Sequence, residues 1–104
     1  MSIVIHEKSS GTVLAKGEPE SDALKYEGNW YFKPEAVESA VLAVTDRTYT
    51  CPYKGTCHWV DYLGSDGSRV KDVAWVYADP KPGHEMIKDR YGFYAGSRGA
   101  TRQD

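Results

Sequence analysis

The chain has 104 residues, of which 13 are basic, 15 are acidic and 40% are hydrophobic, and its formal net charge is -2. This length suits one hydrophobic core, and the balanced charge excludes nucleic-acid or membrane-surface binding that is driven by bulk charge. The sequence shows neither a signal peptide nor an apolar run of about eighteen residues. We therefore expect a soluble cytoplasmic domain that binds neither nucleic acid nor membranes.

The first third of the chain contains short strand-like runs separated by turn residues. Gly11 and Pro19 mark the turns, and Pro34 favours a short helix over residues 34–39 because it fits the first helical position. The predicted strands are Ile3–Ile5, Thr12–Ala15, Ala23–Tyr26 and Trp30–Phe32.

A β-hairpin over residues 55–78 is the clearest signal in the sequence. The runs Gly55–Leu63 and Arg69–Ala78 are joined by Gly64-Ser65-Asp66-Gly67-Ser68, in which Asp-Gly supplies the positive φ angles of a tight turn. Strand alternation predicts that Val73, Trp75 and Tyr77 share one face of the second strand.

After this hairpin, residues 84–90 favour one or two helical turns and residues 91–95 favour a strand. The polar residues 97–104 are expected to form a mobile tail. We therefore predict one β-rich domain over residues 1–96, folded as a compact antiparallel two-sheet sandwich or barrel with one or two short helical turns.

The most distinctive chemistry lies in the segment Cys51-Pro52-Tyr53-Lys54-Gly55, termed the corner below. Pro52 fixes one φ angle and Gly55 permits an unusual one, so the segment can aim its side chains at a common point. In one interpretation Lys54 lowers the pKa of Cys51, or gathers an anionic ligand whose pocket Cys51 lines. In the other, Cys51 is a buried structural residue beside a surface lysine.

The tryptophans offer a similar choice between a pocket and a core. Trp30, Trp59 and Trp75, together with Tyr53 and Tyr77, would either line a pocket for a planar or cationic ligand or fill a small core. The resulting candidate ligand-binding residues are Cys51, Tyr53, Lys54, Trp59, Trp75 and Tyr77.

Metal and cofactor chemistry find little support in the sequence. Cys51, Cys57 and His58 lack the usual Cys-x2-Cys spacing and a second pair of ligands, so we predict no metal and no cofactor. A Cys51–Cys57 disulfide is disfavoured in a reducing compartment. Gly64-Ser65-Asp66-Gly67 is similar to the start of a nucleotidyltransferase site, but Asp66 lacks the carboxylate partner that two metal ions require.

The sequence resembles a small bacterial family of unknown function that sometimes bears the label nucleotidyltransferase domain. The resemblance lies in Thr50-Cys51-Pro52-Tyr53-Lys54-Gly55-Thr56, Ala74-Trp75-Val76-Tyr77-Ala78-Asp79-Pro80, Tyr91-Gly92-Phe93-Tyr94 and Trp30-Tyr31-Phe32-Lys33-Pro34-Glu35-Ala36-Val37. It implies a mostly antiparallel β-domain, with a tent-like two-sheet arrangement as one form, and it implies no established activity.

Three functional hypotheses follow from these features. The first is a small-molecule binding domain with a pocket beside the corner, and the second is a protein-interaction module without a ligand, which uses surface Tyr and Trp residues. The third is an enzyme with Cys51 as nucleophile and His58 or His84 as base. We favour the first, because the sequence places no base or oxyanion donor beside Cys51.

Overall fold

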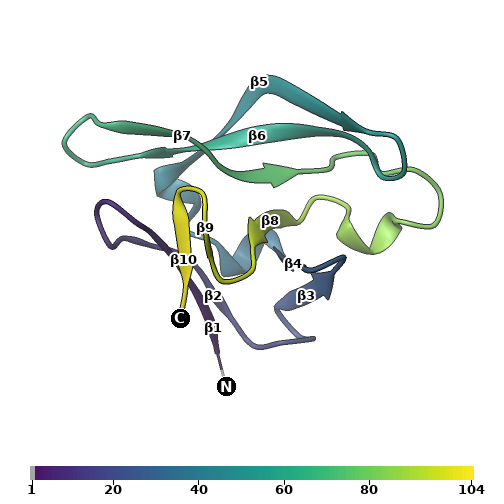
Figure 1. Ribbon diagram of the computed structural model, residues 1–104, viewed down its shortest axis with the longest axis horizontal. Helices are drawn as coiled ribbons and strands as arrows, with labels where there is room; N and C mark the ends of the chain where they lie inside the picture. The colour runs from purple at the N-terminus through teal and green to yellow at the C-terminus, as the bar shows by residue number, and fades with distance from the viewer. Residues whose placement is uncertain (1) are drawn as a thin grey trace.

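The computed structural model describes residues 2–104 and shows two antiparallel sheets packed together (Figure 1). Sheet A has the strand order β2-β1-β10-β9, and sheet B has the order β3-β4-β8-β7-β6-β5. Both sheets remain open, so the predicted sandwich is the correct alternative and the barrel is not.

The strand bounds match most of the runs that were predicted. Sheet A contains β1 (Ile3–Glu7), β2 (Val13–Gly17), β9 (Ser97–Arg98) and β10 (Thr101–Gln103). Sheet B contains β3 (Ala23–Tyr26), β4 (Asn29–Phe32), β5 (Leu42–Cys51), β6 (Gly55–Leu63), β7 (Arg69–Val76) and β8 (Tyr91–Tyr94).

The helical content is limited to short 3-10 turns. Pro34–Ala36 begins with the predicted proline, and Glu85–Ile87 falls within the predicted 84–90 segment. A further turn, Ser39–Val41, lies beside the first, so residues 34–39 do not form one continuous helix. Within the described residues, no helix has the length and apolar character needed to cross a membrane.

The main core lies between the two sheets. Ile5 and Leu14 of sheet A pack with Phe32, Val60 and Phe93 of sheet B, and all five are fully buried. The Phe32 and Phe93 rings meet edge to face with centroids 5.8 Å apart, a favoured aromatic geometry. Burial of these side chains against the opposite sheet supplies the main driving force for folding.

The opposite face of sheet B carries a second cluster, termed the aromatic face below. Its buried members are Tyr31, Cys57, Trp75, Tyr77 and Ile87. The hairpins β3–β4 and β5–β6 lie at opposite ends of the strand order of sheet B, yet a side-chain ion pair joins their turns. Lys54 Nζ donates to Glu27 Oε1 at 2.8 Å across this junction.

A β-bulge breaks the alternation that was predicted for β7. The register with β6 shifts between Val60 and Tyr62, and Asp72 in the opposing segment has a φ of 59°. As a result Val73 joins the core between the sheets, whereas Trp75 and Tyr77 lie on the aromatic face. The prediction that Val73 shares their face was therefore wrong, because residues 71–73 oppose Asp61 alone, so the alternation of side chains is interrupted at Val73.

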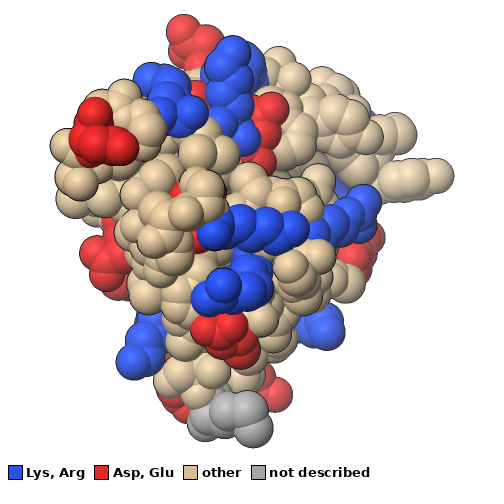
Figure 2. Space-filling view, turned by 60° about the vertical axis from the view of Figure 1, so that its left-hand side comes forward, with Lys and Arg blue, Asp and Glu red and all other residues tan. Residues whose placement is uncertain are grey.

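The bulge also faces a buried carboxylate. Asp61 is fully buried, and it accepts hydrogen bonds from Arg47 and from Arg69 Nε, the latter at 2.7 Å. The backbone N–H of Asp72 donates to the same carboxylate at 3.1 Å. Outside this network, basic and acidic side chains both occur over the face of the molecule seen in Figure 2.

The structure differs from the prediction made from the sequence in two segments. Strand β5 was not predicted, because much of this edge strand is exposed and its sequence shows no clean apolar face. The polar residues expected to form a tail from 97 onward instead contribute β9 and β10, and β10 pairs with β1. Thr101 is buried there, so backbone pairing rather than apolar content holds this segment in sheet A.

Candidate functional site

The corner forms the turn between β5 and β6. Cys51 and Gly55 are the last cross-strand pair before the turn, and Gly55 has a φ of 110°, a conformation that favours glycine. The loop after β7 anchors this turn, because the Lys81 backbone N–H donates to Lys54 O at 2.8 Å and Lys81 Nζ donates to Pro52 O at 2.9 Å. The corner is thus fixed at two of its backbone carbonyls, those of Pro52 and Lys54.

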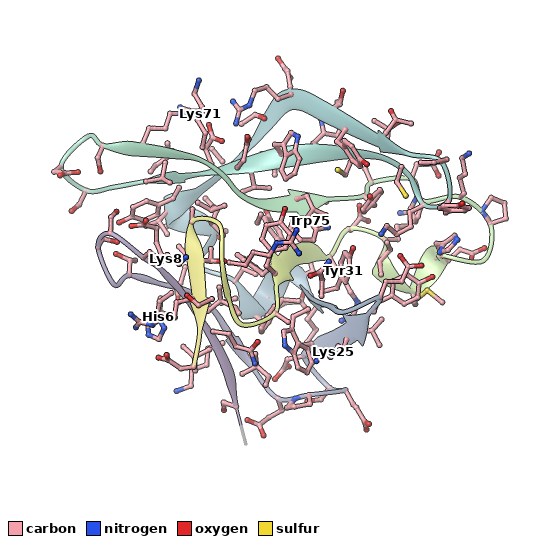
Figure 3. The ribbon with its side chains drawn as sticks, in the orientation of Figure 1. His6, Lys8, Lys25, Tyr31, Lys71 and Trp75 are labelled. Carbon is pink, nitrogen blue, oxygen red and sulfur yellow. The ribbon has the colours of Figure 1, made fainter. Side chains whose placement is uncertain are left out.

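The aromatic face is organised around Trp75. Cross-strand pairing places Trp59 on one side of Trp75 and Gly92 on the other, with Tyr31 opposite Gly92 on the next strand. A Cβ added at Gly92 would collide with the Trp75 indole, so this glycine is needed for the close approach of the ring. The indole Nε1 donates to Tyr31 Oη at 3.1 Å, and both side chains are labelled in Figure 3.

Further aromatic rings extend this arrangement across the sheet. The Trp75 ring lies 5.0 Å from Tyr94 and 6.2 Å from Trp59, centroid to centroid, and Tyr49 lies 6.4 Å from Trp59. Edge-to-face and tilted contacts of this kind fix ring orientation without filling all the space between the rings. The strands therefore present a wall of oriented aromatic side chains.

A cavity of about 130 Å³ opens among these rings. The candidate residues Lys54, Trp59, Trp75 and Tyr77 all line it. It is also lined by residues that the sequence reasoning did not assign to a pocket, namely Asn29, Tyr31, Tyr49, Cys57 and Tyr94. Three of them, Asn29, Tyr31 and Tyr94, come from the aromatic-rich strands β4 and β8. Strand pairing brings them to the central hairpin, because β8 pairs with β7 and β4 pairs with β8.

The other two candidate residues lie outside this lining. Tyr53 is 75% exposed at the tip of the corner, because the tight turn directs it away from the sheet. Cys51 packs at the border of the aromatic cluster and is partly buried. Trp30, the remaining tryptophan, belongs to the core between the sheets, where its Nε1 donates to Gln103 Oε1 at 3.2 Å.

Lys54 supplies the cationic group of the cavity. Burial by itself lowers the pKa of this ammonium, but the hydrogen bond to Glu27 and the nearby charges outweigh burial and leave the pKa above its usual value. Lys54 Nζ also lies 6.0 Å from the centroid of the Tyr77 ring. The same hydrogen bond holds the pKa of the Glu27 carboxyl below its usual range.

Two phenols of the cavity, Tyr31 and Tyr77, and the buried Cys57 thiol have pKa values above their usual range. Burial is the main cause that raises the pKa of Tyr31 and Tyr77, so both hydroxyls keep their protons at neutral pH. Burial likewise raises the pKa of the Cys57 thiol, although a hydrogen bond with Tyr77 acts in the opposite direction. The cavity therefore combines one cation with neutral hydrogen-bonding groups.

Cys51 has a different environment from Cys57. Partial burial would raise the pKa of its thiol, but the backbone N–H groups of Lys54 and Tyr53 and the Lys54 charge together lower that pKa. The imidazoles proposed as bases are engaged elsewhere. His58 Nδ1 lies 3.0 Å from Thr45 O, and His84 Nδ1 is hydrogen-bonded to Tyr26 Oη.

The fold and the cavity define a small antiparallel two-sheet β-domain with an aromatic pocket on one face of its larger sheet. The family described as "Domain of unknown function (DUF427)" has a model that matches residues 8–104. The chain belongs to this family, which is the one its sequence motifs indicated. No curated protein matches the chain closely enough to count as a relative.

The short name of the family model, NTP_transf_9, refers to nucleotidyl transfer. The segment that is similar to such a site, Gly64–Ser68, connects β6 to β7, and Asp66 Oδ1 accepts the backbone N–H of Ser68 at 3.0 Å. Among residues 2–104, no group of three or more His, Cys, Asp or Glu side chains is placed to hold a metal ion. Asp66 thus serves the turn in this structure.

Proposed function

We propose that this domain binds a small molecule in the cavity on its aromatic face. The observation that carries the proposal is the convergence of Lys54, Trp59, Trp75 and Tyr77 on one cavity of about 130 Å³. Ligand sites combine apolar and aromatic walls with a few placed polar groups, and this cavity has that composition. Its residues come from several strands of a hydrogen-bonded sheet, so the walls are formed before any ligand binds.

A fragment screen followed by NMR tests this proposal, because the tryptophans provide their own control. A ligand in the cavity should shift the indole signals of Trp59 and Trp75 and leave that of Trp30 unchanged, since Trp30 belongs to the core between the sheets and lines a different cavity. A shift of the Trp30 signal alone would report binding at that second cavity. The proposal fails if fragments leave Trp59 and Trp75 unchanged, or if all three indole signals move together as they would in partial unfolding.

A second candidate function is protein interaction through the rim of the same face. Its support is the exposure of Tyr53 and Tyr49, which are 75% and 54% accessible, because tyrosines are enriched in protein interfaces. Replacement of Tyr53 by serine should weaken capture of a partner without shifting the Trp75 signal, because Tyr53 does not line the cavity. Sedimentation and pull-down experiments that find only monomer would remove support for this alternative.

A further inference from the structure

If the domain binds a small molecule as proposed above, the cavity on the aromatic face is suited to one particular class of ligand. Size is the first restriction. An engineered cavity of about 150 Å³ holds one benzene molecule, so a cavity of about 130 Å³ holds roughly one six-membered ring. The cavity is open to solvent, so a nucleotide or another ligand with several rings would extend beyond it.

The walls favour a flat ring over a compact aliphatic group. Trp75 stands nearly perpendicular to both Tyr31 and Trp59, with interplanar angles of 81° and 79°. A planar ligand can extend this pattern, because offset and edge-to-face contacts between aromatic rings are favourable beyond the area that they bury.

Charge decides between an anionic and a cationic ring. Lys54 is the one charged residue in the described lining of the cavity. Its side chain is only 15% exposed, whereas its partner Glu27 is 49% exposed and lies outside the lining. The Lys54 ammonium would repel a cationic ligand and attract an anionic one.

The Lys54–Glu27 ion pair also shows how such an anion would be accepted. Glu27 lies in the tight turn between β3 and β4, and its carboxylate already occupies a hydrogen-bonding position at Lys54 Nζ. A ligand carboxylate can take this position while Glu27 turns toward solvent, where an exposed carboxylate is well hydrated. No bond is made or broken in this exchange beyond hydrogen bonds.

We propose that the ligand is a monocyclic aromatic carboxylate, whose ring lies against Trp59, Trp75 and Tyr94 and whose carboxylate replaces Glu27 at Lys54. The neutral hydroxyl of Tyr31 accepts the Trp75 Nε1 hydrogen bond, so its own proton is left to donate to the edge of the ligand. Glu27 then acts as an internal competitor that weakens binding and keeps the lysine paired when the cavity is empty.

Three probes of nearly equal shape test the charge of the ligand, namely benzoate, benzamide and benzylamine. We expect benzoate to bind about tenfold more tightly than benzamide, as one charge-assisted hydrogen bond would provide, and benzylamine to bind more weakly than both. Titration followed by the Trp59 and Trp75 indole signals measures all three affinities.

Variants of the ion pair then test the competitor role. Lys54→Met should remove the preference for benzoate over benzamide, and Glu27→Gln should tighten benzoate severalfold without changing benzamide binding. Lys88→Met and Asp89→Asn are the matched controls. Lys88 Nζ and Asp89 Oδ2 form an ion pair with a distance of 3.1 Å, and neither residue lines the cavity. If Lys54→Met does not fold, Glu27→Gln still decides the question.

The outcomes separate the two proposals. If neither the three probes nor any fragment of the screen shifts the Trp59 and Trp75 indole signals at millimolar concentration, the binding function itself fails. If other fragments shift these signals but benzoate does not, the cavity binds ligands and the inferred carboxylate class is overturned. If benzamide or benzylamine binds as tightly as benzoate, or if Lys54→Met keeps the benzoate preference, the cavity binds ligands but the inferred carboxylate class is overturned.

Discussion

The two faces of sheet B differ in what covers them. One face packs against sheet A through side chains such as Phe32 and Phe93, which carry no polar atoms and line neither of the two described cavities. The other face has no second sheet over it and carries Tyr, Trp and Cys side chains with a cavity among them. The first face therefore provides most of the packing that stabilises the domain, and the second is packed less completely around the cavity in which we propose that a ligand binds.

Adjacent residues of β8 allow this comparison to be tested directly. Phe93→Ala should lower the free energy of unfolding by about 3–5 kcal/mol, because Phe93 is fully buried between the sheets and the change leaves a cavity there. Tyr94→Ala, one residue later on the aromatic face, should cost clearly less, since Tyr94 is only partly buried. Urea denaturation measures both, and equal losses would contradict the proposed division between the faces.

Gly92→Ala should have the next largest effect. The new methyl group would collide with the Trp75 indole, and overpacking of this kind costs about 1–3 kcal/mol. The near-UV circular dichroism of the tryptophans should change as well, because the indole must move. Gly11→Ala serves as a control that strains a positive φ in open space, and it should leave that spectrum unchanged.

Tyr31→Phe should cost less, about 1–2 kcal/mol. The change removes the hydroxyl that accepts the Trp75 Nε1 hydrogen bond and leaves a buried donor without a partner. The expected loss lies in the lower range because water can enter the adjoining cavity. Thermal unfolding gives the stability, and an unchanged melting temperature would show that this hydrogen bond does not hold Trp75 in place.

The smallest effect is expected in the pH dependence of stability. Burial would raise the pKa of Asp61, but hydrogen bonds from Arg47 and Arg69 outweigh it and lower the pKa in the folded state. This carboxylate therefore stabilises the fold above its unfolded pKa of about 3.9, and the contribution is lost as the pH falls through the lower folded pKa.

Asp61→Asn removes this titration, so the stability of the variant should fall less steeply than that of the wild type below about pH 4. Unfolding in urea at a series of pH values measures the two slopes. Asp46→Asn, in the exposed part of β5, makes the same chemical change and is the control. Parallel slopes for the wild type and Asp61→Asn would assign acid sensitivity to other carboxylates.

The sequence predicted much of the local structure because local signals were strong. The turn at Gly64–Ser68 and the strand Gly55–Leu63 were found where predicted, since Asp-Gly favours the turn and flanking β-branched and aromatic residues favour strands. Strand β5 was missed because exposed edge strands need no apolar face. The segment after residue 96 was missed because its place in sheet A depends on hydrogen bonds to β1, which composition does not encode.

The composition of the candidate site was determined in part by the sequence itself. The corner and the central hairpin carry Lys54, Trp59, Trp75 and Tyr77 within a short stretch of chain, and alternation along the strands was enough to associate them. The tertiary structure decided the rest, because the pairing of β7 with β8 and of β8 with β4 brings Tyr31, Tyr94 and Glu27 to this hairpin. Contacts between strands distant in sequence depend on pairing and packing over the whole domain, whereas turns and strand faces depend mainly on neighbouring residues.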